Sequence, residues 1–514
     1  MPTKKSAVII GAGVGGLALA NILAKAGYEV SIYEKNEGPG GRMGILEKDG
    51  FTFDTGPSWY LMKDVFESYF NLFGKSTDGY YKLTRLDPAY KVFFDRTDPV
   101  TITADLNQNL KVFEALETGS ANKLEKYLKR AERNYQTSLD HFLYNPFKSV
   151  TNILNPALIK NVPSFLSVFT SSLHNFIKKS FKSQELQQIL EYPSVFLGAS
   201  PFNTPALYQL MSYLDFKEGV YYPAKDGMYA ATKALVSIGK ELGVSYHYNS
   251  DVSKIVINDT KKEGSTATGI VVDGKQIQAD IVISNADLNF TETKLLDSRY
   301  QTYPEKYWSK KDVGPSALLI YLGVKGSLPE LEHHNLFFVK EWKENFNSIY
   351  KEKRWPERAS IYVSKTTQTD KKTAPKNHEN IFILVPLPAS SSNSKKDEGK
   401  FVEHYLKQLE EMSGIKDLRS RIVTKEVRNP QYFGEVFNSW QNTALGMSHT
   451  LRQTAFLRPS IKSKKVSNLY FVGAGTQPGI GVPMCIISAQ LVYKDLAKDR
   501  TSSAPKIIKS LTNK

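Results

Sequence analysis

Three glycines near the start of the chain have a spacing that suits a phosphate-bearing ligand. Gly11, Gly13 and Gly16 form a Gly-x-Gly-x-x-Gly pattern, and Glu34 follows the last of them after one further helix-and-strand length of sequence. Glycines in this pattern allow a tight turn and bring backbone N–H groups close to a pyrophosphate, while an acid about 20 residues further on accepts hydrogen bonds from a ribose hydroxyl. These residues therefore predict a dinucleotide site.

The same segment also has the parts of a secretory signal peptide. Lys4 and Lys5 precede an apolar run, and the sequence Ala-Leu-Ala occurs at 18–20. Four glycines within six positions, Gly11, Gly13, Gly15 and Gly16, are a poor choice for such an apolar core. We favour the nucleotide interpretation and expect these residues to remain in the mature protein.

The elements that must position the glycines can be predicted from the flanking residues. Residues 7–10 are an apolar, β-branched run, residues 17–25 are rich in helix formers, and Gly27 ends that helix. Residues 28–33 alternate as a second strand and lead directly to Glu34. This strand, turn, helix and strand order places the glycines at a helix N-terminus, where the helix dipole attracts phosphate.

A second glycine-rich stretch follows Glu34. Gly40 and Gly41 allow the backbone to run close to a ligand, and Arg42 can pair with pyrophosphate oxygens. The sequence Asp-Thr-Gly-Pro-Ser at 54–58 comes shortly afterwards.

A third stretch of this kind lies near the other end of the chain. Residues 468–475 predict a strand that runs into glycines, and residues 476–484 carry two glycines between two prolines. They form a stiff loop that leads into a helix expected to start near Cys485, whose N-terminus could stabilise negative charge.

Composition excludes several other chemistries. A single cysteine among 514 residues rules out an internal disulfide and a cysteine-based metal cluster, and the eight histidines show no paired zinc spacing, so no metal site is expected. No window reaches the roughly 18 apolar residues of a membrane-spanning helix. The formal charge of +15 favours an anionic partner or a solvated, lysine-rich surface.

The positive charge is unevenly distributed. Residues 141–184 contain no Asp or Glu but several lysines and many phenylalanines. Such a segment could lie in a membrane interface or could be a core helical segment with exposed lysines, and the residues alone leave both open. Nucleic acid ranks lower because no DNA- or RNA-binding module is recognisable. Residues 365–380 and 389–399 are polar and predict exposed loops.

Several of these motifs together resemble one family. The glycine-arginine stretch at 38–42, Pro-Phe-Asn-Thr at 201–204, the stretches at 219–228 and 284–287, and Thr-x-Pro-Gly-x-Gly-Val-Pro at 476–483 are similar to those of the bacterial and archaeal, CrtI-type phytoene desaturases. This family lies within the FAD-dependent amine oxidase and desaturase superfamily. The resemblance covers nearly the whole chain, and the loop at 476–483 is its most specific part.

The resemblance implies an α/β fold with a Rossmann-like FAD-binding domain built from discontinuous segments, a mixed-sheet substrate domain and a helical membrane-associating insertion. We expect FAD-binding segments at 1–70, 216–295 and 456–498 and substrate-domain segments at 71–130 and 296–455. The helical membrane-associating region is expected at 131–215 and a flexible basic tail at 499–514.

The resemblance also implies the cofactor and its ligands. We expect FAD to be bound by Gly11, Gly13, Val14, Gly15, Gly16, Glu34, Lys35, Gly41, Arg42, Gly56, Pro57, Val252, Gly473, Gly475, Gly481, Val482 and Met484. The catalytic proton acceptor is not predicted. Some relatives carry an acid and an arginine in the helix before 201–204. The matching stretch here, residues 182–188, has glutamines instead, and Glu185 is its single acid and a weak candidate. Many relatives have histidine where this chain has Gln477.

We therefore expect an FAD-dependent carotenoid desaturase that acts on a long, phytoene-like polyene and passes electrons to oxygen or a quinone. The enzyme would be cytoplasmic and bound peripherally to a membrane surface. A carotene isomerase or another polyene-modifying flavoenzyme is the nearest alternative. A prenyl-lipid escort protein of the same fold is an alternative of another class, and a soluble amine oxidase is a further one.

Overall fold

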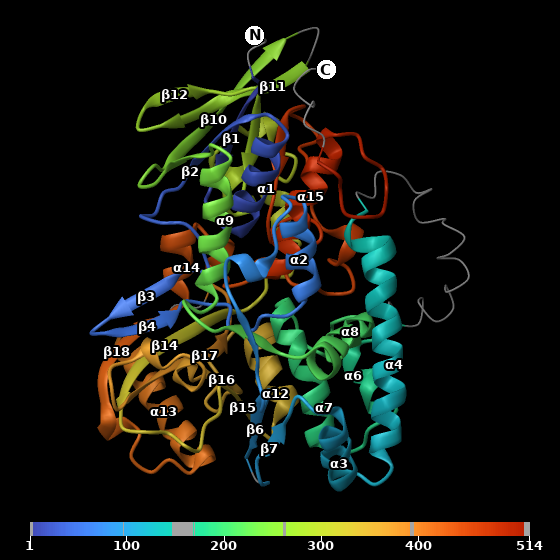
Figure 1. The fold of residues 1–514 in the computed structure, drawn as a ribbon, viewed down its shortest axis with the longest axis vertical. Helices are drawn as coiled ribbons and strands as arrows, with labels where there is room; N and C mark the ends of the chain where they lie inside the picture. The colour runs from blue at the N-terminus through green and yellow to red at the C-terminus, as the bar shows by residue number, and fades with distance from the viewer. Residues whose placement is uncertain are drawn as a thin grey trace.

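The computed structural model describes residues 4–95, 97–145, 168, 170–260, 264–390 and 395–507. Along the long axis of the molecule, a small three-stranded sheet lies at one end and a parallel sheet with helices follows it (Figure 1). The other end holds a seven-stranded sheet and, beside it, a group of helices.

A five-stranded parallel sheet has the strand order β19-β13-β1-β2-β9. The Val8 and Ile9 side chains of β1 are buried on opposite faces, as expected for a strand covered on both sides. Helix α1 packs against both α15 and α9. The bounds are β1 Ser6–Ile10, α1 Val14–Lys25, β2 Glu29–Tyr33, α9 Tyr229–Glu241, β9 Ser245–His247, β13 Ile281–Ser284, β19 Leu469–Phe471 and α15 Val482–Leu496.

The small sheet is antiparallel and is inserted between strands β9 and β13. Its strands are β10 Val252–Thr260, β11 Gly264–Val272 and β12 Lys275–Gln278. Its apolar face packs on the parallel sheet, since Ile255 and Ile270 share a buried cluster with Val8 and Val282.

A seven-stranded mixed sheet has the order β18-β14-β17-β16-β15-β6-β7. Strands β14 and β17 are largely buried, and helix α13 covers one face through Tyr405, Leu406 and Leu409. The bounds are β6 Tyr90–Phe94, β7 Val100–Ile102, β14 Ser316–Lys325, β15 His334–Phe338, α12 Trp342–Asn347, β16 Ile361–Ser364, β17 His378–Leu387, α13 Lys395–Ser413, β18 Ile422–Arg428 and α14 Pro430–Phe437. Two separate two-stranded antiparallel sheets are also present: the hairpin of β3 Ile45–Lys48 and β4 Phe51–Asp54, and the pair of β5 Leu83–Arg85 with β8 Tyr221–Pro223, whose strands are distant in the sequence.

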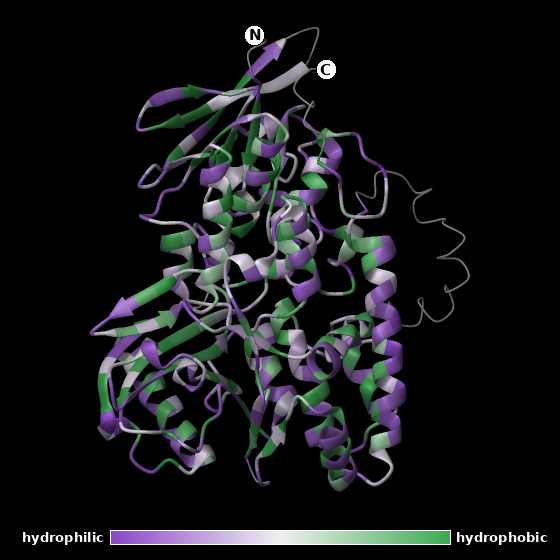
Figure 2. Ribbon diagram, viewed as in Figure 1, coloured by the Kyte–Doolittle hydropathy of each residue, from purple (hydrophilic) through white to green (hydrophobic). Residues whose placement is uncertain are grey.

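The helical group lies beside the seven-stranded sheet. Its long helix, α4, turns a buried stripe that includes Leu124, Leu128 and Tyr135 inward, and Figure 2 shows hydrophilic residues along much of its length. The helices of this group are α3 Leu106–Leu116, α4 Ser120–Ser138, α6 Leu173–Lys178, α7 Gln184–Glu191 and α8 Leu210–Tyr213. Helix α2 Lys63–Asn71 packs against α15, and the shorter α10 Leu288–Lys294 and α11 Glu305–Trp308 lie near the parallel sheet.

The predicted fold class is confirmed: a Rossmann-like domain drawn from separated segments stands beside a mixed-sheet domain. The segment boundaries stay a prediction. Residues 146–167 and 169 of the acid-free segment at 141–184 lie outside the described residues. None of the described helices combines the length and the apolar character that crossing a bilayer requires.

Two polar stretches, within 365–380 and after α15, make buried hydrogen bonds to the rest of the fold. Within 365–380, Thr366, Thr367 and Asn380 are buried and bonded to one another, so this part is packed rather than exposed. Near the C-terminus the fully buried amino group of Lys494 donates to the Thr501 and Ser503 carbonyl oxygens, which holds this stretch against α15.

Candidate active site

A cavity of about 600 Å³ runs between the parallel sheet and the seven-stranded sheet. Its lining comes from loops that follow β1, β2, β9 and β13 and from strands β14 to β17. The carboxyl ends of parallel strands meet at one edge of a sheet, which is where α/β proteins bind their ligands.

The glycine turn forms one end of the cavity. Helix α1 begins at Val14, and its N-cap residue Gly13 provides no side-chain cap, so the first backbone N–H groups of the helix remain available to a ligand. A Cβ atom on Gly13 would lie 2.7 Å from Nδ2 of Asn285. The space in front of the helix is open because Gly13 has no side chain. The N–H groups that point into this space suit a phosphate.

Glu34 lies at the end of β2 on the same wall. Its side chain is 6% exposed, and one carboxylate oxygen accepts the Ala12 N–H at 2.8 Å. The other accepts the Asn36 N–H at 2.9 Å. A carboxylate so held against the glycine turn can receive ribose hydroxyls on its remaining lone pairs.

Arg42 is half-buried and directly follows Gly41, which lies against the glycine turn. One of its terminal nitrogens donates to the Ser439 hydroxyl, whereas its buried Nε has no partner among the described residues. Burial lowers the pKa of the Arg42 guanidinium, and the nearby Asp287 opposes that shift. Burial raises the pKa of the Asp287 carboxyl, and Arg42 acts against this change in turn. A guanidinium with free donor capacity suits an anionic ligand.

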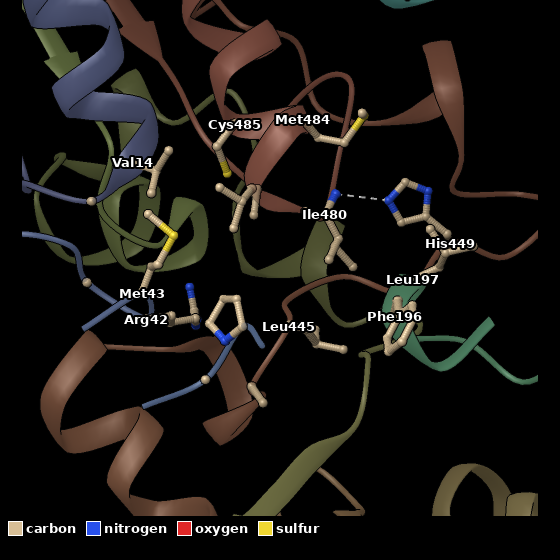
Figure 3. A pocket seen from close by; sticks show the side chains of 18 of the residues that line it. Val14, Arg42, Met43, Phe196, Leu197, Leu445, His449, Ile480, Met484 and Cys485 are labelled. Atoms are coloured by element: carbon tan, nitrogen blue, oxygen red, sulfur yellow. Dashed lines mark hydrogen bonds between the residues drawn. The ribbon is translucent and has the colours of Figure 1, made fainter. Parts of the chain in front are cut away.

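The loop at 476–484 also lines the cavity, and Figure 3 shows its residue Ile480 next to His449. His449 Nε2 accepts the Ile480 N–H at 3.2 Å, and His449 Nδ1 lies 2.6 Å from the Tyr208 hydroxyl. Because Nε2 accepts, the proton of the neutral ring is on Nδ1. Burial, reinforced by the charge of Arg458, lowers the pKa of His449 well below its usual range. His449 therefore holds the loop as a neutral hydrogen-bonding group.

Arg458 fastens the same loop from behind. It is 3% exposed and donates to the carbonyl oxygens of Ala474 and Met447 at 2.9 and 3.1 Å. Burial lowers the pKa of Arg458 to about 10, so it remains cationic at neutral pH. Helix α15 then starts at Val482 after Gly481, which again supplies no side-chain cap.

The other half of the cavity is apolar and rich in aromatic rings. The carboxylates that line the cavity among the described residues, Glu34, Asp251 and Asp287, all follow strands of the parallel sheet. The aromatic lining of the apolar half includes Trp59, Tyr192, Phe196, Phe338, Trp342, Phe346, Tyr350 and Tyr362.

Most of the predicted cofactor residues meet at this cavity, although they come from separated parts of the chain. The lining includes Gly11, Gly13, Val14, Gly15, Glu34, Lys35, Gly41, Arg42, Gly56, Pro57, Val252, Gly481, Val482 and Met484. Gly16, Gly473 and Gly475 lie behind the lining, where they allow close packing.

Glu185 is not brought to the cavity. It lies in the first turn of α7, and its carboxylate accepts the Ser183 hydroxyl at 2.7 Å. Gln477 lines the cavity, and His449 lies close to the same loop.

Asn285, Asp287 and His449 also line the cavity, although they are not among the cofactor residues predicted from the sequence. Asn285 and Asp287 directly follow β13, the neighbour of β1 in the sheet, so polar residues at the end of a buried strand were the available signal. His449 had no such signal because its loop joins the site only through tertiary packing.

The site fits a dinucleotide cofactor, because it has two uncapped helix N-termini, the Glu34 carboxylate and the unpartnered Nε of Arg42. It defines the chain as an α/β nucleotide-binding protein whose cavity has a second, apolar half. The family model for flavin-containing amine oxidoreductases matches residues 14–492. The chain belongs to this family, and FAD is its cofactor.

Individual relatives extend this result. The chain is 41% identical to a carotenoid 3,4-desaturase of Haloarcula japonica over 96% of its own length and 98% of the relative. It is 36% identical to a zeta-carotene-forming phytoene desaturase of Myxococcus xanthus, over 95% and 93% of the two chains. An oxidoreductase of Methanosarcina mazei shares the fold, with a TM-score of 0.63 and 17% identity over 95% and 100% of the two chains.

Proposed function

We propose that this protein is an FAD-dependent carotenoid desaturase that introduces double bonds into a long, linear polyene. The observation that carries the proposal is the continuity between the two halves of one cavity, one lined by the predicted FAD residues and the other by aromatic rings. An apolar chain in the second half would be directed at the cofactor in the first. The relatives named as carotenoid and phytoene desaturases support the same substrate class.

Bound FAD supplies a hydride acceptor for the two-hydrogen oxidation. The protein residues hold the reactants and exclude water. Glu34, Arg42 and the uncapped start of α1 would bind the dinucleotide portion. The uncapped start of α15 would offer N–H groups to a negatively charged part of the bound cofactor. The aromatic lining orients the polyene and offers ring faces to the positive charge that develops on its carbons.

Peripheral binding to a membrane surface is part of the proposal. Long polyenes dissolve in bilayers, and the formal charge of +15 favours anionic headgroups. The acid-free segment at 141–184 combines lysines with phenylalanines in the way that interfacial segments do. Either oxygen or a membrane quinone would accept the electrons.

The test is to incubate the purified protein with FAD and phytoene-loaded liposomes and to follow the products by absorbance and chromatography. New absorbance bands at longer wavelength that depend on FAD would support desaturation and count its steps. A changed cis/trans pattern without such bands would favour the isomerase. Bound FAD with unchanged polyenes across several precursors would contradict both enzymes and favour a lipid carrier.

Liposome flotation tests the membrane part separately. We expect the protein to float with anionic liposomes and to float less as salt concentration increases, because the charge attraction is screened. Protein that stays at the bottom with anionic and neutral liposomes alike would contradict surface binding.

A further inference from the structure

The apolar half of the cavity has no carboxylate in its described lining, although the proposed oxidation releases a proton. Glu34, Asp251 and Asp287 line the cavity, but all three follow strands of the parallel sheet. When two hydrogens leave adjacent carbons as a hydride and a proton, a positioned base speeds the second loss. An aromatic or aliphatic wall offers no such base, so we searched for one that is reached through the wall.

Asp215 lies directly behind an aromatic residue of that wall. Tyr192 lines the cavity, and its hydroxyl donates to Oδ2 of Asp215 at 2.9 Å. Tyr90 donates to the same oxygen at 2.8 Å but does not line the cavity. Asp215 is 5% exposed, and its Oδ1 has no partner among the described residues. One hydrogen bond therefore connects the cavity wall to a buried carboxyl group.

Tyr192 lies where the two halves of the cavity meet. Its ring centre is 5.9 Å from that of Trp59, which follows the predicted cofactor residue Pro57 after one serine. It is 5.7 Å from the ring centre of Phe196, which Figure 3 shows on the same side of the pocket as His449. A proton acceptor at this position serves the part of the substrate that lies next to the cofactor.

The protonation equilibrium of Asp215 suits this task. Burial raises the pKa of its carboxyl to about 7, and the hydroxyls of Tyr90, from β6, and of Tyr192, from the turn after α7, oppose the shift. No charged side chain of the described residues contributes to the shift. A general base is most effective when its pKa lies near the working pH, because the group then both binds and releases a proton.

The other polar groups of the wall are poorer acceptors. Both nitrogens of His449 are already used in hydrogen bonds. Tyr362 lies 2.7 Å from Nδ1 of His334, but burial lowers the pKa of that histidine well below its usual range. Tyr135 lines the cavity and donates to Asp64, which is exposed, so water competes for its carboxylate.

We propose that Tyr192 takes the proton from the polyene and passes its own hydroxyl proton to Asp215. The C–H bond beside the carbon that has lost hydride breaks, its electron pair becomes the new double bond, and its proton goes to the Tyr192 oxygen. The original Tyr192 O–H bond breaks at the same time, and its proton moves along the existing hydrogen bond to Oδ2 of Asp215. The inference rests on the proposed function, in which the cofactor takes the hydride, and adds the group that receives the proton.

The experiment measures product formation in a single turnover with phytoene-loaded liposomes at pH values on either side of the Asp215 pKa. We expect the wild-type rate to rise as the pH increases through about 7, because the carboxylate must be ionised to accept a proton. Asp215→Asn should lower the rate by roughly 100-fold and should lose this rise.

Two tyrosine variants separate the proton path from mere support of the carboxylate. Tyr192→Phe and Tyr90→Phe each remove one hydrogen bond to the same oxygen, but only Tyr192 lines the cavity. We expect Tyr192→Phe to lower the rate at least about tenfold more than Tyr90→Phe does. If Asp215→Asn fails to fold, this pair still tests the proposal.

Glu292→Gln is the matched control for Asp215→Asn. Burial raises the pKa of the Glu292 carboxyl to about 7, and its Oε1 has no partner among the described residues, but Glu292 does not line the cavity. This variant should keep the wild-type rate and pH profile. Quenching of the fluorescence of Trp59 and Trp342, which line the cavity, shows whether each variant still binds the polyene.

Equal losses in Tyr192→Phe and Tyr90→Phe would overturn the inference, and so would a rise with pH that persists in Asp215→Asn. A larger loss in Asp64→Asn than in Asp215→Asn would assign the proton to the pair of Tyr135 and Asp64 instead. In these cases the wild type still forms the desaturated product, so the proposed function stands. A wild type that binds the polyenes and converts none of them refutes the proposed function, and the proton path with it.

Discussion

Arg42 shows at the scale of one residue how the cavity is prepared for an anion. Its guanidinium is buried beside Asp287, is bonded to Ser439 and retains an unpartnered Nε. A buried cation of this kind is costly unless its donors are used. The cost of burying this cation is offset when a ligand oxygen accepts a hydrogen bond from the Arg42 Nε.

We expect Arg42→Ala to weaken FAD binding by roughly 10- to 100-fold, since charge-assisted hydrogen bonds contribute about 1.5–3 kcal/mol each. Titration of the protein freed of FAD, followed by flavin fluorescence, measures this. Arg354→Ala is the control because Arg354 is exposed and pairs with Glu344 and Glu352. Equal affinities of the two variants would remove Arg42 from the FAD site.

Asp215 gives a pH-dependent prediction. Burial raises the pKa of its carboxyl to about 7, although the hydroxyls of Tyr90 and Tyr192 both donate to it. The folded protein therefore holds a proton that the unfolded chain releases near pH 4, so this group makes stability fall as the pH rises from about 4 to about 7. The loss is complete above the folded pKa.

Replacement of Asp215 by Asn removes this contribution to the pH dependence of stability. We expect the stability of Asp215→Asn relative to the wild type to be greater at pH 8 than at pH 5 by roughly 1–3 kcal/mol. Urea unfolding of both proteins at the two pH values measures the difference. If the variant differs from the wild type by the same amount at pH 5 and pH 8, Asp215 does not titrate in this window.

At the scale of the element, the first strand, helix and second strand could be predicted because their signals are local. Gly11, Gly13 and Gly16 lie within one turn, and hydrophobic periodicity changes on either side of it. The helix begins at Val14, three residues earlier than its helix formers indicate, because the glycines themselves continue into the first turn. The sequence predicts an exposed loop at 365–380, whereas Thr366 and Thr367 are buried and bonded to Asn380. Hydrogen bonds between such side chains leave no periodic pattern in the sequence.

Gly16 has a role in packing rather than in ligand contact. A Cβ atom there would lie 2.4 Å from the Gly11 carbonyl oxygen, so α1 would have to move away from the turn. We expect Gly16→Ala to lower the free energy of unfolding by roughly 2–4 kcal/mol, as measured by denaturant unfolding without FAD.

Gly38→Ala is the comparison for this prediction, because a Cβ atom on Gly38 meets no atom within 4 Å. It should leave stability within about 0.5 kcal/mol of the wild type. Similar losses in the two variants would contradict the packing role of Gly16.

At the scale of the whole molecule, the proposed cofactor site draws its residues from three regions of the chain. Residues 11–16, the strand at Ile281–Ser284 and the loop before α15 meet at the edge of one sheet. The family resemblance predicted this discontinuity, whereas the residues alone did not. Strand pairing between residues hundreds of positions apart, such as β6 with β15, depends on long-range packing and leaves no local signal.

This arrangement predicts that FAD stabilises the whole fold and not one segment. A ligand that binds only the folded protein adds about 2.7 kcal/mol at a free concentration of 100 times its Kd. Because β1, β13 and β19 form one sheet, the unfolding of any of the three regions abolishes the site. Removal of FAD should therefore lower the thermal midpoint of the parallel sheet and of the adjoining seven-stranded sheet together. Scanning calorimetry with and without FAD measures this, and a shift confined to one of two separate transitions would show that the two sheets unfold independently.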